Sequence, residues 1–480
     1  MGTDRMRRMR VCAVCALGLS TAVAEARPVP RSALAARLAE GPEVIGIVHW
    51  GLNTYTDREW GYGDEDPKRL APDAFDADQI VAACKAGGLG GLVIVAKHHD
   101  GFCLWPTKTT GHNISKAPFR NGKGDYVKEM SDACRRAGLK FGVYCSPWDR
   151  NAADYGSPSY VEKYHAQVKE LLDGRYGEVF EMWFDGANGG DGYYGGAREK
   201  RRIPYGYYRF DEVFAFVRAF QPGVCIFAGE EDSSDFRWPG NERGILDPDS
   251  RATCDGVFGL VPQPDGHLGY GNPGYAAQIN TGSPTGTFFR VCEADFPLRP
   301  GWFYHAKERG QTKNAAYLMQ RYLNTVGNGG TMNLGVAPDR RGRLDDEDVR
   351  ALKGFGDLRR AFFARPVTSG LANVVVLRED IAKGERITGW TVTADGRPLA
   401  SGKVVGNKRI RILPETVDVS RIRVAAEGGE LKSVEYYRAD PELVKLVRDA
   451  TTESGETDTA KWMTGAVSRV SRGVALGEEI

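Results

Sequence analysis

The 480-residue sequence lacks the features that mark several classes of protein. Its formal net charge is +1, which gives no surplus of charge for binding nucleic acid or an anionic membrane. Beyond residue 26 it has no CxxC pair and no zinc-finger spacing, and HxH and HExxH motifs are absent throughout. No glycine-rich dinucleotide fingerprint follows the first predicted strand. We therefore expect neither a nucleic-acid partner nor a cofactor.

Long hydrophobic runs are also scarce. The one near the N-terminus, from Val11 to Val23, is too short for a convincing membrane anchor. Arg7, Arg8 and Arg10 precede it, and small residues at positions 24 and 26 follow it, which is typical of a signal peptide. We expect residues 1–26 to be removed and the mature protein to begin near Arg27. It would then be exported to a periplasm or the extracellular space, without insertion into a membrane.

Nine cysteines are present, and two of them lie in the predicted signal peptide. The remaining seven are an odd number, so at least one is a free thiol. Export permits disulfides, but the sequence does not fix any pairing. Several of the seven lie in apolar helix or strand patterns, and we expect most of them to be core residues.

Short apolar runs alternate with helical periodicity from Ile45 to about residue 355. Asp76 and Asp125 are predicted helix N-caps, and Ser159 with Glu162 forms a predicted capping box. Repeated strand–helix alternation favours an α/β fold with a parallel sheet, best matched by a (β/α)₈-like TIM barrel over residues 27–360. A doubly wound open sheet is the alternative.

The pattern changes after about residue 365. Four short strand-like segments, separated by turn residues, predict a C-terminal antiparallel β-sandwich over residues 365–440, followed by a tail over residues 441–480. Such a domain could brace the barrel or bind carbohydrate, and we expect the bracing role. The predicted strands are residues 374–377, 388–392, 409–413 and 422–424.

Polar and aromatic side chains gather at the ends of the predicted barrel strands. His49 ends the first strand, His98 and His99 follow the second, Tyr144 ends the third, and Asp185 follows the fourth. The carboxyl ends of barrel strands face one common mouth, where catalytic residues of such barrels lie. Asp185 could alternatively be only a helix cap.

Two chemistries fit these residues. Metal-dependent hydrolysis would use His98, His99 and Asp100, but adjacent residues on a strand point to opposite faces, so the pair is poorly placed unless the strand has ended. Glycoside hydrolysis by two carboxyl groups fits better, with Asp185 as the candidate nucleophile. The residues alone leave the second carboxyl group open; its candidates are Glu230, Glu231, Asp232, Glu242 and Asp295.

Eight segments in order resemble the α-L-fucosidases of glycoside hydrolase family 29, over roughly residues 40–360. They are His49-Trp50-Gly51, Glu59-Trp60-Gly61, residues 97–102 (KHHDGF), Gly142-Val143-Tyr144, Trp183-Phe184-Asp185-Gly186, residues 237–242 (RWPGNE), residues 299–305 (RPGWFYH) and residues 328–338. The resemblance implies a retaining mechanism in a (β/α)₈-like barrel with a C-terminal β-sandwich, and we expect no metal. It implies that Asp185 is the nucleophile and Glu242 the acid/base. The Gly-Asn-Glu run resembles that of the branch preferring α-1,3/4-linked fucose.

The resemblance also implies a set of substrate-binding residues for fucose and its neighbouring sugar. These are His49, Glu59, Trp60, His98, His99, Tyr144, Trp183, Arg237, Trp238, Asp295 and Trp302. The expected function is release of L-fucose from fucosylated glycans. The alternatives are a fucose-binding protein without turnover, a transglycosylase, or a glycosidase of the same fold acting on another sugar. The sequence does not fix the oligomeric state.

Overall fold

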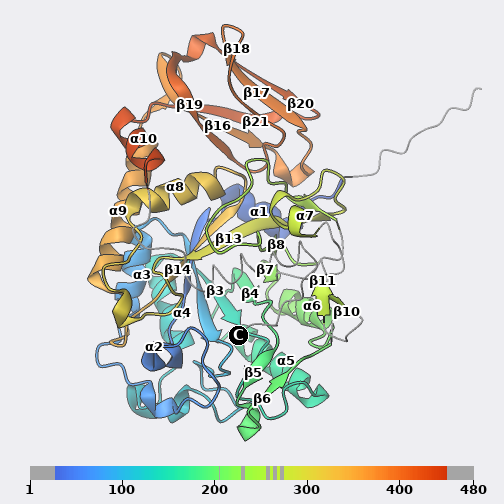
Figure 1. The fold of residues 1–480 in the computed structure, drawn as a ribbon, viewed down its shortest axis with the longest axis vertical. Coiled ribbons are helices and arrows are strands. Elements are labelled where there is room, and N and C mark those ends of the chain that lie inside the picture. Colours follow the sequence, from blue (N-terminus) through green and yellow to red (C-terminus); the bar gives the residue numbers. More distant parts are fainter. Residues whose placement is uncertain are drawn as a thin grey trace, which may run out of the picture.

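The computed structural model describes residues 27–204, 206–228, 233–255, 260–262, 268–270 and 275–450. In this part of the chain, eight parallel strands close into a barrel in the order β1-β14-β13-β8-β7-β4-β3-β2 (Figure 1). The predicted barrel is therefore confirmed, and the open sheet is not the architecture. The strands are β1 (Val44–Val48), β2 (Gly91–Lys97), β3 (Lys140–Cys145), β4 (Glu181–Phe184), β7 (Cys225–Ala228), β8 (Phe236–Arg237), β13 (Val291–Pro297) and β14 (Thr331–Val336).

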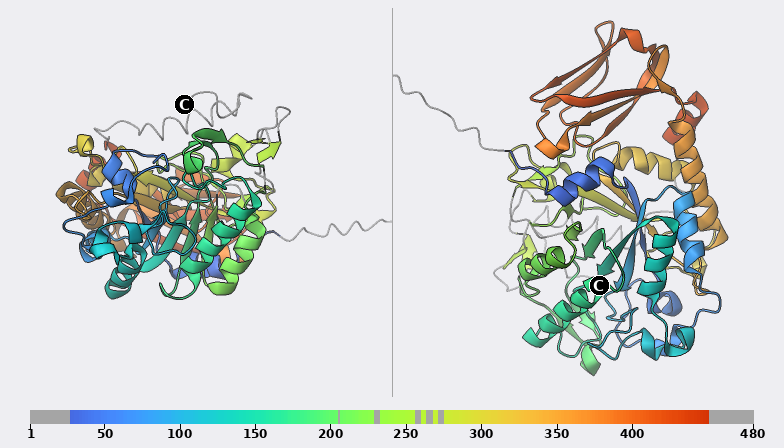
Figure 2. Two further views of the ribbon diagram at one scale, coloured as in Figure 1. Left: turned by 90° about the horizontal axis from the view of Figure 1, so that it is seen from below. Right: turned by 180° about the vertical axis from the view of Figure 1, so that it is seen from behind.

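Helices surround the barrel (Figure 2). Their apolar faces pack on the outward-facing strand residues in one large core. Among the described residues, no helix has the length and apolar character needed to cross a membrane. The helices are α1 (Ser32–Glu40), α2 (Leu52–Thr56), α3 (Ala77–Ala86), α4 (Tyr126–Ala137), α5 (Pro158–Leu172), α6 (Phe210–Phe220), α7 (Tyr275–Thr281), α8 (Ala315–Thr325), α9 (Asp346–Phe362) and α10 (Pro441–Arg448).

Two predicted helix starts are confirmed and one is wrong. The carboxylates of Asp76 and Asp125 accept hydrogen bonds from the first turns of α3 and α4. Helix α5 instead begins at Pro158, after an N-cap at Ser157, so the capping box predicted at Ser159 does not form. Proline is favoured at the first helical position because its φ is already helical and its missing N–H would have no partner there.

The C-terminal unit consists of two antiparallel sheets, ordered β15-β21-β16-β19 and β18-β17-β20, that share an apolar core. This is the predicted sandwich. The four predicted strand segments lie within β16, β17, β19 and β20, whereas β15, β18 and β21 were not predicted. Bounds are β15 (Pro366–Val367), β16 (Leu371–Glu379), β17 (Gly389–Ala394), β18 (Arg397–Gly402), β19 (Arg409–Asp418), β20 (Ile422–Glu427) and β21 (Leu431–Tyr437). Short strand pairs elsewhere are β5 (Gly190–Gly192) with β6 (Glu199–Arg201), β9 (Thr253–Cys254) with β12 (Phe288–Phe289), and β10 (Leu260–Pro262) with β11 (Leu268–Tyr270).

The sandwich covers the amino-terminal end of the barrel, as Figure 1 shows. Glu43, which immediately precedes β1, accepts hydrogen bonds from Lys408 Nζ at 2.8 Å to both carboxylate oxygens. Asn328, just before β14, accepts a hydrogen bond from Arg411 at 3.0 Å. These contacts place the sandwich at the end of the barrel opposite to the carboxyl ends of its strands, which fits the bracing role.

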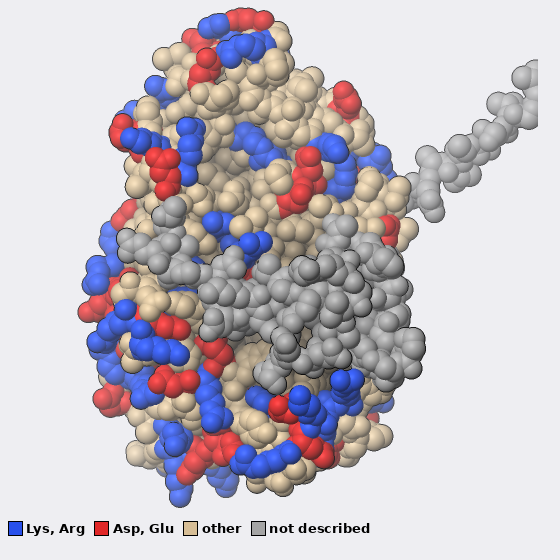
Figure 3. Space-filling view, in the orientation of Figure 1, with Lys and Arg blue, Asp and Glu red and all other residues tan. Residues whose placement is uncertain are grey.

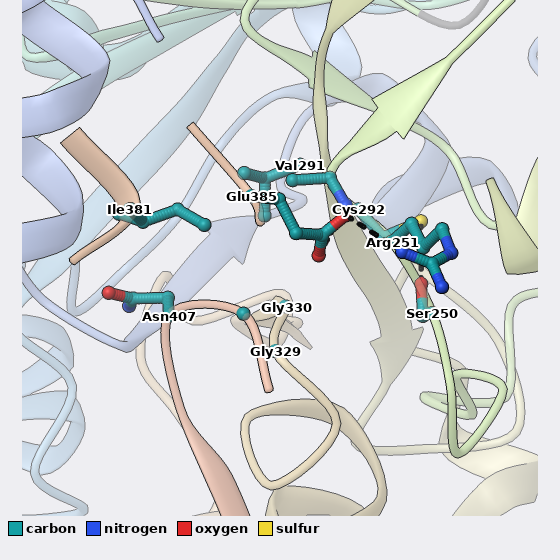
Figure 4. A pocket seen from close by; sticks show the side chains of 11 residues that line it. Ser250, Arg251, Val291, Cys292, Gly329, Gly330, Ile381, Glu385 and Asn407 are labelled. Atoms are coloured by element: carbon teal, nitrogen blue, oxygen red, sulfur yellow. Dashed lines mark hydrogen bonds and ion pairs between the residues drawn. The ribbon is translucent and has the colours of Figure 1, made fainter. Parts of the chain in front are cut away.

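A small pocket lies at the same junction (Figure 4). Its buried carboxyl group, Glu385, accepts hydrogen bonds from Ala252 N and Thr253 Oγ1 of the barrel, at 3.3 and 3.4 Å. Burial raises the pKa of Glu385 to about 7, although Arg251 acts in the opposite direction. The pocket therefore belongs to the packing between the two units.

We expect Lys408→Met to lower the free energy of unfolding by about 1–2 kcal/mol, less than for a fully buried ion pair because Glu43 is partly exposed. The side chains of Lys408 and Glu43 are 12% and 32% exposed. Burial opposes ionisation of Glu43, but Lys408, Tyr322 and Arg378 together hold its pKa below the ordinary value. Such a carboxylate stabilises the fold above its unfolded-state pKa, and the contribution is lost as pH falls through its folded-state pKa.

Urea unfolding at pH 7 and pH 3.5 measures this effect, with Lys116→Met at an exposed position as the control. The difference in the free energy of unfolding between Lys408→Met and wild type should be present at pH 7 and smaller at pH 3.5. An equal difference at both pH values would contradict the assignment to the Glu43 ion pair.

Positive and negative side chains are interspersed on the face shown in Figure 3. This distribution matches the formal net charge of +1. Over the described residues of that face, no large patch of only positive side chains is visible that could attract a polyanion.

Candidate active site at the carboxyl end of the barrel

Asp185 lies directly after β4, at the mouth of the barrel, with 26% of its side chain exposed. Tyr144 Oη donates a hydrogen bond to its Oδ2 at 3.0 Å, and Ala187 N donates to its Oδ1 at 2.7 Å. Tyr144 is the second-last residue of the neighbouring strand β3. The carboxylate is therefore held by one donor on each oxygen and remains accessible.

Three buried histidines lie beside this carboxylate. Strand β2 ends at Lys97, so His98 and His99 follow the strand rather than alternate along it, and their ring centroids are 4.2 Å apart. His49, after β1, has its ring centroid 5.7 Å from that of His98. Burial lowers the pKa of His49 to about 3, of His99 to about 4, and of His98 well below its usual value. All three rings are therefore neutral near pH 7.

Neutral imidazoles could serve as metal ligands as well as hydrogen-bonding groups. Among the residues that the structure describes, no three His, Cys, Asp or Glu side chains gather as a metal-binding group. Asp100, the third candidate ligand, instead accepts a hydrogen bond from Phe102 N at 3.0 Å in its own loop. The described geometry therefore favours hydrogen bonding to hydroxyl groups as the role of the histidines.

Aromatic side chains form the floor and walls of the site. Trp183 stacks on Phe227, with centroids 3.9 Å apart, and on Tyr144, at 5.3 Å. The ring of Trp60 stands perpendicular to that of His99 at 5.3 Å. Flat apolar surfaces next to hydrogen-bonding groups suit a sugar ring, which has both apolar and hydroxylated faces.

Glu242 follows β8 and lies partly buried beside the aromatic wall. Trp302 Nε1 donates a hydrogen bond to its Oε2 at 3.3 Å. Burial raises the pKa of Glu242 to about 8, and the negative charges of Asp185 and Glu59 act in the same direction, against the Trp302 hydrogen bond. At neutral pH this carboxyl group is therefore mainly protonated and can donate a proton.

Asp295, on β13, is a second buried acid next to Glu242. Burial raises its pKa well above the usual value, and Glu242 and Glu293 contribute in the same direction. Its Oδ1 is buried without a hydrogen-bond partner among the described residues. Asp295 was predicted as a sugar contact, and the structure places it beside Glu242.

Glu59 was predicted to bind substrate, and the structure ties it to the loop after β13. Its carboxylate accepts hydrogen bonds from Trp302 N at 2.8 Å and Phe303 N at 3.2 Å. His305 Nε2 lies 2.6 Å from Glu59 Oε1. Burial lowers the pKa of His305, but Glu59 and Asp57 outweigh it and the net shift is upward. Glu59 thereby fixes the loop that carries Trp302.

Arg237, another residue predicted to contact the sugar, is bound within the protein. Its guanidinium donates hydrogen bonds to three main-chain oxygens, those of Ile279, Arg251 and Arg290. Phe236 packs into the barrel interior, and side chains alternate along a strand, so Arg237 points to the outside of the barrel wall. Its neighbour Trp238 is partly buried against Cys254 and Ile279.

Sequence reasoning assigned no role to Ser146, Arg150 or His305. Ser146 Oγ lies 2.8 Å from His99 Nδ1, and Arg150 donates to Gly61 O at 2.6 Å, next to Trp60. Ser146 and Arg150 lie in the loop after β3, and His305 lies in one of the matching motifs. Their positions in this loop and in this motif indicated that they lie near the site. The residues that they contact, however, lie far away in the chain. Of the other candidates for the second carboxyl group, Glu230, Glu231 and Asp232 lie outside the described residues.

A closed parallel barrel with an accessible carboxylate and a protonated carboxyl group at its carboxyl end has the architecture of a glycoside hydrolase. A family model described as Alpha-L-fucosidase matches residues 36–232. The chain is 34% identical to a glycoside hydrolase 29 family member from an unknown rumen bacterium; the match covers 86% of this chain and 78% of that one, with a TM-score of 0.78. The chain belongs to glycoside hydrolase family 29, the α-L-fucosidase family, as its motifs predicted.

Two further relatives agree with this assignment. The chain is 34% identical to a putative alpha-L-fucosidase from Bacteroides ovatus, covering 90% of this chain and 76% of that one, with a TM-score of 0.74. It is 38% identical over 324 residues to "Putative alpha-L-fucosidase 1" of Oryza sativa subsp. japonica, covering 67% of this chain. The match spans 57% of the length of the rice protein.

Proposed function

We propose that the protein is a retaining exo-α-L-fucosidase that releases L-fucose from α-1,3/4-fucosylated oligosaccharides or glycoconjugates. The observation that carries this proposal is the contrast between Asp185 and Glu242. The carboxylate of Asp185 accepts a hydrogen bond on each oxygen, whereas burial and neighbouring negative charges raise the pKa of Glu242 to about 8. Acid/base-assisted displacement at a sugar requires a nucleophilic carboxylate and a second carboxyl group that can donate a proton.

In the first step, Asp185 attacks the anomeric carbon of the fucosyl group and forms a covalent glycosyl–enzyme ester. Glu242 donates its proton to the glycosidic oxygen, and the remaining glycan leaves as an alcohol. In the second step Glu242, now ionised, takes a proton from water, which attacks the same carbon and releases fucose and Asp185. The Tyr144 hydroxyl orients the nucleophile throughout.

The neutral histidines and the aromatic walls bind the fucosyl group in this proposal. His49, His98 and His99 offer donor and acceptor nitrogens to its hydroxyl groups, and Trp60 and Trp302 offer apolar faces. The preference for α-1,3/4 linkages is supported by the Gly240-Asn241-Glu242 run, which resembles that of the branch with this preference. Export to a periplasm or the extracellular space is supported by the signal-like residues 1–26.

Fucose release from a Lewis-type trisaccharide and from an aryl α-L-fucoside tests the substrate assignment. We expect cleavage of the trisaccharide, with little or none of the aryl fucoside. Efficient cleavage of the aryl fucoside alone would contradict the linkage preference. Absence of fucose release from both, together with binding of fucose, would favour a binding protein without turnover.

A further inference from the structure

Ser146 connects the loop after β3 to the histidine next to the nucleophile. Its side chain is fully buried, and its Oγ lies 2.8 Å from His99 Nδ1 and 2.9 Å from Trp148 O. A serine hydroxyl carries one proton, and a carbonyl oxygen can only accept. The contact with Trp148 O therefore uses the serine proton. Tyr144, which also interacts with the Ser146 side chain, gives its own proton to Asp185, so His99 Nδ1 is the donor to Ser146 Oγ.

The other ring nitrogen of His99 faces the nucleophile. His99 Nε2 lies 3.8 Å from Asp185 Oδ2, which is beyond hydrogen-bond distance. Burial lowers the pKa of His99 to about 4, although the charge of Asp185 acts in the opposite direction. The ring is therefore neutral and carries one N–H. Because Nδ1 holds that proton, Nε2 presents a lone pair beside Asp185.

The ring is also held in its orientation from both sides. Trp148 contacts it with centroids 5.2 Å apart, and Trp60 stands against it at 5.3 Å. His99 itself is 2% exposed. A ring flip would exchange the two nitrogens, but it would break the contact with Ser146 inside this packed environment.

We propose that Ser146 is a positioning residue that holds His99 in the Nδ1–H tautomer, so that Nε2 accepts a hydrogen bond from a hydroxyl of the bound sugar beside Asp185. The identity of that sugar rests on the proposed function, whereas the tautomer does not. The opposite tautomer would direct an N–H toward Asp185 and disperse the charge of the nucleophile. The serine thus keeps His99 as an acceptor and leaves Tyr144 as the donor to Asp185 Oδ2.

Nitrogen-15 NMR of histidine-labelled protein tests the tautomer without substrate. The chain has seven histidines, and His99→Gln assigns the His99 signals by their loss. In wild type at pH 7 we expect the proton on Nδ1 and an unprotonated Nε2. In Ser146→Ala we expect a share of the ring to change to the Nε2–H form, whereas Ser146→Thr, which keeps the hydroxyl, retains the wild-type signals. A proton on Nε2 in wild type would overturn the proposal.

Kinetics with the same variants test the consequence. Losing the outer hydrogen-bond partner of a functional histidine typically costs 10–100-fold in metal sites. We expect kcat/KM to fall about tenfold or more in Ser146→Ala, with Ser146→Thr closer to wild type and the buried Ser131→Ala, in α4, unchanged. A loss of activity in Ser146→Ala with an unaltered tautomer would contradict the proposal. If wild type hydrolyses no fucoside, the proposed function fails, and the NMR comparison alone decides the tautomer.

Discussion

Asp185→Ala should lower kcat on a hydrolysable fucoside by about 10³–10⁵-fold, as expected for removal of a catalytic nucleophile. Without this carboxylate no covalent fucosyl intermediate forms, and the remaining groups supply only binding and proton donation. The side chain is partly exposed and is held by Tyr144 and Ala187 alone among the hydrogen bonds described for it. Its removal should therefore leave the fold intact.

Azide provides the specific readout for this variant. A small anion can occupy the space left by the carboxylate and attack the anomeric carbon directly, giving a fucosyl azide of inverted configuration. The matched control is Asp191→Ala, six residues further on in β5, which should retain wild-type activity. Substantial residual hydrolysis by Asp185→Ala, or no azide product from a substrate with a good leaving group, would contradict the assignment of the nucleophile.

Glu242→Gln should lower activity on oligosaccharides by about 10²–10⁴-fold, the usual contribution of general acid–base catalysis. The glutamine keeps the size of the side chain and can still accept the hydrogen bond from Trp302 Nε1, but it has no proton to donate to the glycosidic oxygen. Whatever slow cleavage of aryl fucosides with acidic leaving groups the wild type shows should be reduced less, because departure of these leaving groups needs less protonation.

The pH dependence of kcat/KM separates this role from a structural one. Glu242 acts as an acid when protonated, so wild-type activity should fall as pH rises through its pKa of about 8. Glu242→Gln should lose this alkaline decline, whereas Glu212→Gln, at the exposed start of α6, should keep it. An unchanged profile and near-wild-type activity in Glu242→Gln would make Glu230 the acid/base candidate.

The sequence predicted the residues at the ends of the regular strands. Asp185, His49, His98, His99 and Tyr144 follow or end apolar runs, and the parallel barrel brings such positions to one mouth. This inference needs only local periodicity and the geometry of the fold. The family assignment followed from motifs at the same strand ends.

Contacts made across the barrel could not be predicted in the same way. The direction of Arg237 depends on which face of the two-residue strand β8 it occupies, and so short a strand has no readable alternation. Glu59 is bound by a loop more than 240 residues later in the chain. The partnership of Ser146 with His99 depends on the path of the loop after β3. Each of these follows from tertiary packing rather than from a sequence pattern.

The stereochemistry of the first-formed product tests the central claim most directly. Proton NMR, recorded within minutes of adding wild-type enzyme to a cleavable α-L-fucoside, distinguishes the two anomers of released fucose before they interconvert. Double displacement through Asp185 and Glu242 predicts that α-L-fucose appears first, and β-L-fucose only later through mutarotation. Initial release of β-L-fucose would contradict the account, because it requires direct attack by water and no covalent intermediate at Asp185.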